Sequence, residues 1–142
     1  MPQELQSPEI QAWAGGFPLA LLHAGIAIIL LIGAVCLYAL ISPHRDVQNV
    51  RRGNAASAIS LGGVIVCLAL PLAVAVAAST SLADVAIWGV AALFVQLALF
   101  RLIDLLLHGL PQRVDEGELS AALLLVSAKL ASAIVLSAAI AT

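Results

Sequence analysis

The stretch HRDVQNVRRGNAASAISL, residues 44–61, decides the fold, because a related stretch, HGLPQRVDEGELSAALLL, occupies residues 108–125. Shifting the sequence by 64 positions aligns the two stretches without a gap. The identities are His44 with His108, Gln48 with Gln112, Val50 with Val114, Gly53 with Gly117, Ala58 with Ala122, and Leu61 with Leu125. We therefore predict two related helical hairpins, each built around one polar loop and arranged as parallel repeats about an axis along the membrane normal.

Long apolar runs flank both polar loops. Of the 142 residues, 63% are hydrophobic and 10% are charged, whereas soluble domains carry about 25% charged residues. A membrane-spanning helix needs about 20 mostly apolar residues, and four runs meet this length: 17–41, 55–78, 84–107 and 119–141. The sequence predicts an all-α integral membrane protein with a short extracytoplasmic tail (1–16) and one four-helix domain (17–142), made of hairpins 17–78 and 84–142.

Basic residues outside the spans predict the orientation of the chain. Arg45, Arg51, Arg52 and Arg113 lie in the first and third polar breaks, whereas the N-terminal tail, the second break and the C-terminus have no Lys or Arg. Cytoplasmic loops collect Lys and Arg. We expect both termini to lie outside the cytoplasm.

Several classes of function are disfavoured by composition. The net charge is −2, and six basic residues spread along the chain do not form a groove that tracks phosphates, so nucleic-acid binding is excluded. Cys36 and Cys67 lie in apolar runs without a CxxC spacing, and no nucleophile, base and orienting group occur together. We expect no metal, no cofactor and no enzymatic activity.

Two charged residues interrupt the third span. Arg101 and Asp104 are three residues apart, a spacing that places them on one helix face. Counted back from His108, both lie within about 10 Å of the inner boundary of the membrane. We expect an interfacial ion pair between them, with a functional site facing a cavity or partner as the alternative.

Lys129 lies deeper in the membrane. It is about 16 Å from Glu118, near the middle of a core about 30 Å thick, where a charged side chain faces the bundle interior, a wet cavity or a partner. Gln96 lies at a similar depth, so we hypothesise that Gln96 and Lys129 face one another. The first hairpin has Leu37, Leu40 and Ile65 opposite Arg101, Asp104 and Lys129.

Two further features are candidates for contacts with other molecules. The first polar loop contributes a possible interaction surface for a membrane-associated protein or the anionic inner leaflet, consisting of His44, Arg45, Arg51, Arg52 and Asn54. Small residues at intervals of four, such as Ala69, Ala73 and Ala77, permit close helix packing. They serve either packing within the chain or docking of a second copy.

Three stretches carry a family resemblance: SPHRDVQNVRRGNAASAISLGG (42–63), LPLAV (70–74) and DVAIWGVAALFVQLALF (84–100). They resemble the YjfL-like family of uncharacterised bacterial inner-membrane proteins, also described as domain of unknown function 350. The resemblance covers nearly everything from Phe17 onward. It implies paired two-helix repeats in the inner membrane and no established chemistry. Members are encoded near proteins similar to phage-shock protein A and near ATP-grasp ligases, which implies a link to envelope maintenance.

The sequence is compatible with two functions. The first is a small scaffold in the lipid bilayer that forms homo-oligomers or docks a protein partner. The second is a channel or transporter for a small ion or solute, using the midplane polar residues Lys129, Gln96, Arg101 and Asp104. We favour the scaffold, because four spans enclose little space in one copy.

Overall fold

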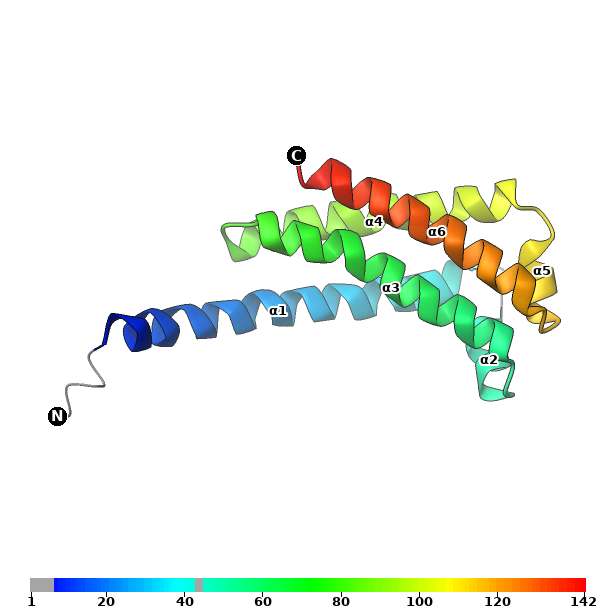
Figure 1. Ribbon diagram of the computed structural model, residues 1–142, viewed down its shortest axis with the longest axis horizontal. Helices are drawn as coiled ribbons and strands as arrows, with labels where there is room; N and C mark the ends of the chain where they lie inside the picture. The colour runs from blue at the N-terminus through cyan, green and yellow to red at the C-terminus, as the bar shows by residue number, and fades with distance from the viewer. Residues whose placement is uncertain (1–6, 43–44) are drawn as a thin grey trace.

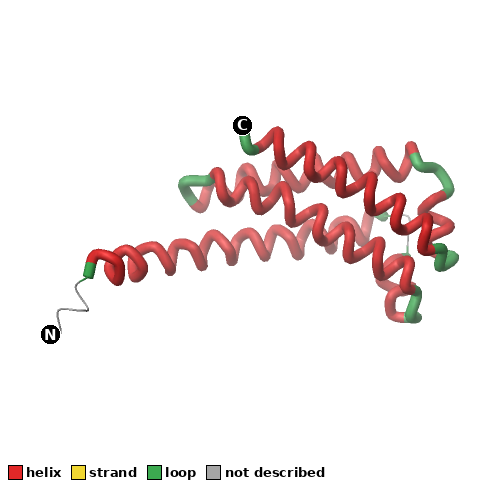
Figure 2. Tube along the Cα trace, in the orientation of Figure 1, coloured by secondary structure: helices red, strands yellow, loops and turns green. Residues whose placement is uncertain are grey.

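The part of the chain that the structure describes is helical apart from short connections. The computed structural model describes residues 7–42 and 45–142 (Figure 1, Figure 2). The helices are α1 (Pro8–Ile41), α2 (Asp46–Arg51), α3 (Ala55–Ala78), α4 (Leu82–Leu106), α5 (Leu110–Asp115) and α6 (Leu119–Ile140). In this part of the chain, α1, α3, α4 and α6 are long and apolar enough to cross a membrane. The prediction of an all-α protein with four such helices is confirmed.

Polar side chains cap the first turns of three long helices. The Asn54 side-chain oxygen accepts a hydrogen bond from the Ser57 backbone N–H at 3.1 Å, which caps α3. The Ser81 hydroxyl accepts from the Asp84 N–H at 3.2 Å and caps α4, and Ser7 caps α1 in the same way. Such caps satisfy backbone donors that have no partner inside the helix. The predicted breaks between spans therefore coincide with helix ends to within two residues.

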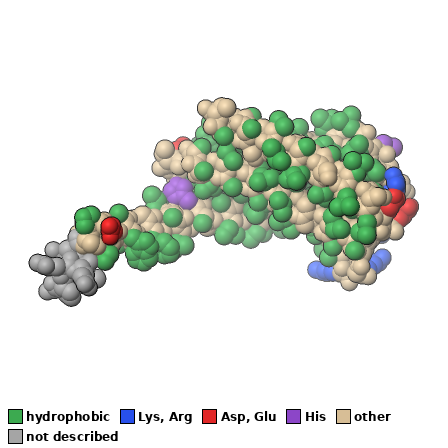
Figure 3. Space-filling model, in the orientation of Figure 1, with side chains coloured by type: hydrophobic (Ala, Val, Ile, Leu, Met, Phe, Trp, Pro, Cys, Tyr) green, Lys and Arg blue, Asp and Glu red, His purple; other side chains and the backbone are tan. Residues whose placement is uncertain are grey.

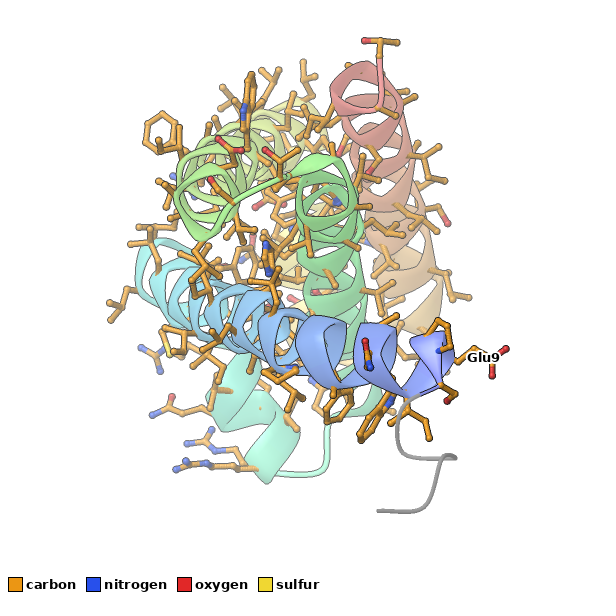
Figure 4. The ribbon with its side chains drawn as sticks, turned by 90° about the vertical axis from the view of Figure 1, so that its left-hand side faces the viewer. Glu9 is labelled. Carbon is orange, nitrogen blue, oxygen red and sulfur yellow. The ribbon has the colours of Figure 1, made fainter. Side chains whose placement is uncertain are left out.

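Helix α1 begins nine residues before the predicted span. Ser7 at the N-cap, Pro8 in the first turn and Glu9 beside it form a strong start signal. With 34 residues the helix is about 51 Å long, which exceeds the hydrocarbon thickness of a bilayer. Residues 8–22 are exposed, and this half of α1 extends beyond the other helices (Figure 1), with Glu9 pointing away from the bundle (Figure 4).

The two polar loops each contain a short helix that the sequence did not predict. Helices α2 and α5 have six residues each and begin 64 positions apart. A glycine with positive φ lies two residues after the end of each, 84° at Gly53 and 90° at Gly117, which is the usual geometry just past a helix end. The next residue closes the turn, from Asn54 N to Asn49 O at 2.9 Å and from Glu118 N to Arg113 O at 3.0 Å. From the short helix onward the two loops therefore follow the same backbone course, whereas their entries differ, with φ −92° at Arg45 and 88° at Gly109.

Helix α3 is the centre of the bundle and packs against α1, α4 and α6 (Figure 4). The approach of α3 to α6 is closest at Gly63, where a Cβ atom would lie 2.6 Å from a methyl group of Val126. The core includes Tyr38, Leu68 and Phe100, and a second cluster lies beneath α5. Both α2 and α5 lie at one end of the bundle, which we call the short-helix end (Figure 1).

Candidate functional site

A buried ion pair joins α4 and α6. The Lys129 ammonium lies 2.9 Å from the Asp104 carboxylate, and the two side chains are only 1% and 4% exposed. Opposite charges at this distance offset much of the cost of removing each from water. The pair therefore allows both residues to remain charged inside the bundle.

Tyr38 of α1 completes the site around the ammonium. The Nζ atom of Lys129 donates a hydrogen bond to the Tyr38 hydroxyl at 3.1 Å. The same atom lies 5.1 Å from the centroid of the Tyr38 ring and 5.3 Å from that of Phe100, within the range of cation–π attraction. The two rings pack edge to face, 5.9 Å apart. Three helices thus contribute to one polar cluster, which we call the Lys129 cluster: Tyr38, Phe100, Asp104 and Lys129.

Helix direction explains how residues at different depths meet. Asp104 and Tyr38 lie two and three residues from the ends of α4 and α1 at the short-helix end, whereas Lys129 lies ten residues into α6. The Cα–Cβ bond of a helical residue tilts toward the helix N-terminus. Because α6 starts at the short-helix end, Lys129 points back toward it, while Asp104 and Tyr38 point toward the middle of the bundle.

Arg101 does not take the role that the sequence predicted. The expected partner, Asp104, instead pairs with Lys129, and Arg101 is exposed. The prediction of an Arg101–Asp104 pair is therefore wrong. The reason is tertiary: Asp104 faces α6 across the bundle, and a buried ammonium has more to gain from a carboxylate than an exposed guanidinium has.

Gln96 also differs from its predicted role. It is fully buried, and its side-chain amide donates to the Ser132 hydroxyl at 3.0 Å. Ser132 in turn donates to the backbone oxygen of Lys129 at 2.7 Å. Gln96 is therefore linked through Ser132 to the α6 backbone at Lys129. The Lys129 ammonium, which we expected to face Gln96, contacts Asp104 and Tyr38 instead.

A groove of about 520 Å³ opens beside the Lys129 cluster at the short-helix end. Both α4 and α5 line it, and its lining includes Arg101, Asp104, Leu105, His108, Gln112 and Asp115. Asp104 therefore lines the groove while its buried carboxylate contacts Lys129. A second groove, of about 450 Å³, is lined by Tyr38, Ser42, Arg45, Asp46 and Gln48 among others.

Asn54 holds the two loops together. Besides capping α3, its side-chain amide donates to the backbone oxygen of Asp115 at 3.0 Å. Asn49 of α2 donates to the Asp115 carboxylate at 2.8 Å. Asn54, predicted as part of an interaction surface, thus has a structural contact in the fold.

The other predicted loop residues lie at the surface. Arg45, Arg51 and Arg52 are exposed, and His44 lies outside the described residues. The charged side chains visible in Figure 3 gather largely at the short-helix end. Arg113 of α5 forms an ion pair with Glu118, the N-cap residue of α6. Hydrogen bonds from the side chains of Arg113 and Ser120 hold the pKa of the Glu118 carboxyl below its usual range.

Comparison with known proteins identifies the family. The family model described as Domain of Unknown Function (DUF350) matches residues 12–140. The chain belongs to the DUF350 family. The UPF0719 inner membrane protein YjfL of Escherichia coli K12 is 26% identical over 110 residues, which cover 78% of this chain and 82% of the relative. The protein of the same name from E. coli O157:H7 gives the same values. No solved structure matches the chain.

The predicted family and location are confirmed by these matches. This DUF350 chain is a multi-pass protein of the bacterial inner membrane, with four helices able to span it. Sequence reasoning missed Tyr38 as a member of the polar cluster, because an aromatic residue near a span end is typical of the membrane interface. It also missed Asp46, which is buried at the start of α2. Tyr38 lies four residues after Ala34, which is buried, and residues four apart share one face of a helix. This spacing is the sequence signal that could have placed Tyr38 in the interior.

Proposed function

We propose that this DUF350 chain is a non-catalytic membrane scaffold that assembles with copies of itself. The burial of the Lys129 cluster carries this proposal. Lys129, Asp104 and Tyr38 are all buried and contact one another, so they join three helices and are unsuited to lining a conducting path in one copy. Charged residues in this arrangement favour a fixed bundle over a channel.

The outward face of α3 supports self-assembly. Small residues recur along this face, opposite the buried face of the helix: Ala58, Gly62, Ala73 and Ala77 are exposed, and Ala69 is half-buried. Ile65 and Val66 are exposed between the two groups. On α4, by contrast, large side chains such as Ile87, Phe94 and Leu105 are exposed. Helices associate in lipid through close backbone approach at small residues, so α3 is the face suited to a second copy.

We further propose that the bundle consists of two parallel hairpin repeats with both termini outside the cytoplasm. The starts of α2 and α5 are 64 positions apart, as are Gly53 and Gly117, and this common offset supports the repeat. The arginines near α2 support the orientation. The family resemblance adds the proposed link to envelope maintenance.

The oligomeric state in lipid nanodiscs tests the scaffold. We expect the wild type to be oligomeric and Ala73→Leu, which adds bulk on the α3 face, to shift the mass toward the monomer. Ala91→Leu is the matched control, because Ala91 is exposed on α4; its mass should equal that of the wild type. A wild-type protein that is monomeric in nanodiscs at all concentrations contradicts self-assembly.

A flux assay separates the scaffold from the channel. Liposomes containing the purified protein should show no more ion or solute flux than empty liposomes. A strong flux that Lys129→Leu abolishes would instead support a channel or transporter, in which the buried cluster opens to a path between copies.

A further inference from the structure

The groove between α4 and α5 holds donors that the fold itself does not use. Of its two carboxylates, Asp104 pairs with Lys129, and one oxygen of Asp115 accepts from Asn49. Arg101, His108 and Gln112 also line the groove, and within residues 7–42 and 45–142 none of these three side chains forms a hydrogen bond or an ion pair.

Arg101 is placed where its guanidinium can bind an anion. It lies five residues before the end of α4, about 7.5 Å inside the span. A guanidinium at this depth reaches the level of lipid phosphates by extending toward the interface, and its planar fork suits a phosphate oxygen pair. The groove volume of about 520 Å³ is in the range that holds a small ligand.

We propose that this groove binds the headgroup of a phospholipid that carries a primary ammonium, in the leaflet at the short-helix end. Arg101 binds the phosphate, with His108 and Gln112 as further hydrogen-bond donors. Asp115 lies at the end of α5, outside the span, and its second carboxylate oxygen receives the ammonium. In the groove the cation, Arg101, lies nearer the membrane centre than the anion, Asp115. In such a lipid the phosphate likewise lies nearer the membrane centre than the ammonium, so each charge of the headgroup faces an opposite charge of the groove.

Among the described residues, the first hairpin lacks the charges that make this site. Residues 37 and 40, which correspond to Arg101 and Asp104 at the 64-residue offset, are both leucine, and Arg51 corresponds to Asp115. The second groove of the bundle therefore lacks both the deep cation and the outer anion at the matching positions. The inference concerns a lipid site within one chain and does not depend on self-assembly.

Native mass spectrometry of the purified full chain in detergent tests the site. The probes are phosphatidylethanolamine, phosphatidylglycerol and phosphatidylcholine with the same acyl chains. We expect the tightest binding with phosphatidylethanolamine, because phosphatidylglycerol lacks an ammonium and the methylated ammonium of phosphatidylcholine donates no hydrogen bond. Equal binding of the three lipids by the wild type overturns the proposal.

Two substitutions separate the contacts. Arg101→Leu should weaken binding of phosphatidylethanolamine about tenfold, the effect of losing a charge-assisted hydrogen-bond pair. Asp115→Asn should retain the contact with Asn49 and remove the preference over phosphatidylglycerol. Arg51→Leu, on exposed α2, is the matched control and should bind as the wild type does.

Two further measurements complete the test. If Arg101→Leu does not fold, Arg101→Lys retains the charge without the fork and should bind with intermediate affinity; unchanged affinity in either folded variant overturns the site. Soluble phosphoethanolamine should compete only at concentrations far above those of the lipid. Competition at equal concentration would assign the groove to a free phosphate ester and overturn the lipid assignment.

Discussion

At the scale of single residues, the Lys129 cluster shows how a membrane bundle accommodates charge. Lys129 and Asp104 are nearly inaccessible, yet each faces an opposite charge at 2.9 Å. The Tyr38 hydroxyl and two aromatic rings occupy further positions around the ammonium. Removing one member of the ion pair leaves the other as an uncompensated charge, whereas removing both leaves no buried charge at this site.

We therefore expect Lys129→Met to lower the free energy of unfolding by about 3 to 5 kcal/mol, because it strands the Asp104 carboxylate. The double variant Lys129→Met with Asp104→Leu should recover most of this loss. Unfolding titrations with a denaturing detergent measure both. An equally large loss in the double variant would contradict this explanation, because removing the stranded carboxylate would then recover nothing.

At the scale of elements, glycine allows α3 and α6 to approach closely. Neighbouring glycines in α3 differ sharply in surroundings: a Cβ at Gly63 would lie 2.6 Å from Val126, whereas one at Gly62 meets nothing within 4 Å. Val126 is β-branched and stiff in a helix, so it cannot easily move aside. The contact between the two helices thus depends on a missing methyl group at one position.

Gly63→Ala should destabilise the bundle by about 1 to 3 kcal/mol, the usual cost of overpacking. Gly62→Ala is its matched control and should leave stability unchanged or raise it by up to about 1 kcal/mol, because alanine is the better helix former. Thermal unfolding of the two variants in the same detergent compares them. A smaller loss for Gly63→Ala than for Gly62→Ala would contradict the packing described for α3 and α6.

The junction of α5 and α6 gives a dependence on pH. Hydrogen bonds from Arg113 and Ser120 lower the pKa of Glu118. A carboxyl whose pKa is lower in the folded state stabilises that state above its unfolded pKa of about 4.3, and this contribution is lost as the pH falls through the folded pKa. Because both side chains are exposed, the effect is small.

The melting temperature should therefore fall slightly more between pH 6 and pH 3 in the wild type than in Arg113→Gln. Differential scanning fluorimetry in detergent at low ionic strength gives both profiles. Parallel profiles of the two proteins would mean that the Arg113–Glu118 pair contributes nothing to folding.

At the scale of the whole molecule, the proposed orientation follows from the loops. The arginines lie at the short-helix end, and the C-terminus lies at the opposite end of the bundle (Figure 1). Positive charge retains a loop in the cytoplasm, so the short-helix end should face the cytoplasm and the lipid site should lie in the inner leaflet.

Thiol labelling in intact cells tests this orientation. With Cys36 and Cys67 replaced by alanine, a membrane-impermeant reagent should label Thr142→Cys once the outer membrane is permeabilised, and Arg52→Cys only after the inner membrane is opened. Both residues are exposed in the fold. Labelling in the reverse order would contradict this orientation. The short-helix end would then face outward, and the proposed lipid site would lie in the outer leaflet.

The bounds of the long helices, except the start of α1, follow from the local signals used in the sequence analysis. Apolar runs of spanning length and capping residues such as Asn54 place α3 and α6 almost to the residue, because a helix in lipid must satisfy its own backbone. The short helices α2 and α5 escape prediction, since six residues give too little periodicity to separate a helix from a turn. The family assignment likewise follows from motifs that lie next to one another in the chain.

The sequence by itself determined the class of the protein, its membrane location, its family and the ends of its spanning helices except the start of α1, because each depends on residues that are close together along the chain. Only the tertiary structure decided which polar residues meet. Asp104 and Arg101 share one helix face, yet Asp104 pairs with Lys129 from another helix, and Tyr38 reaches the same ammonium from a third. Such partners depend on helix direction, depth and side-chain reach, which act between segments far apart in sequence.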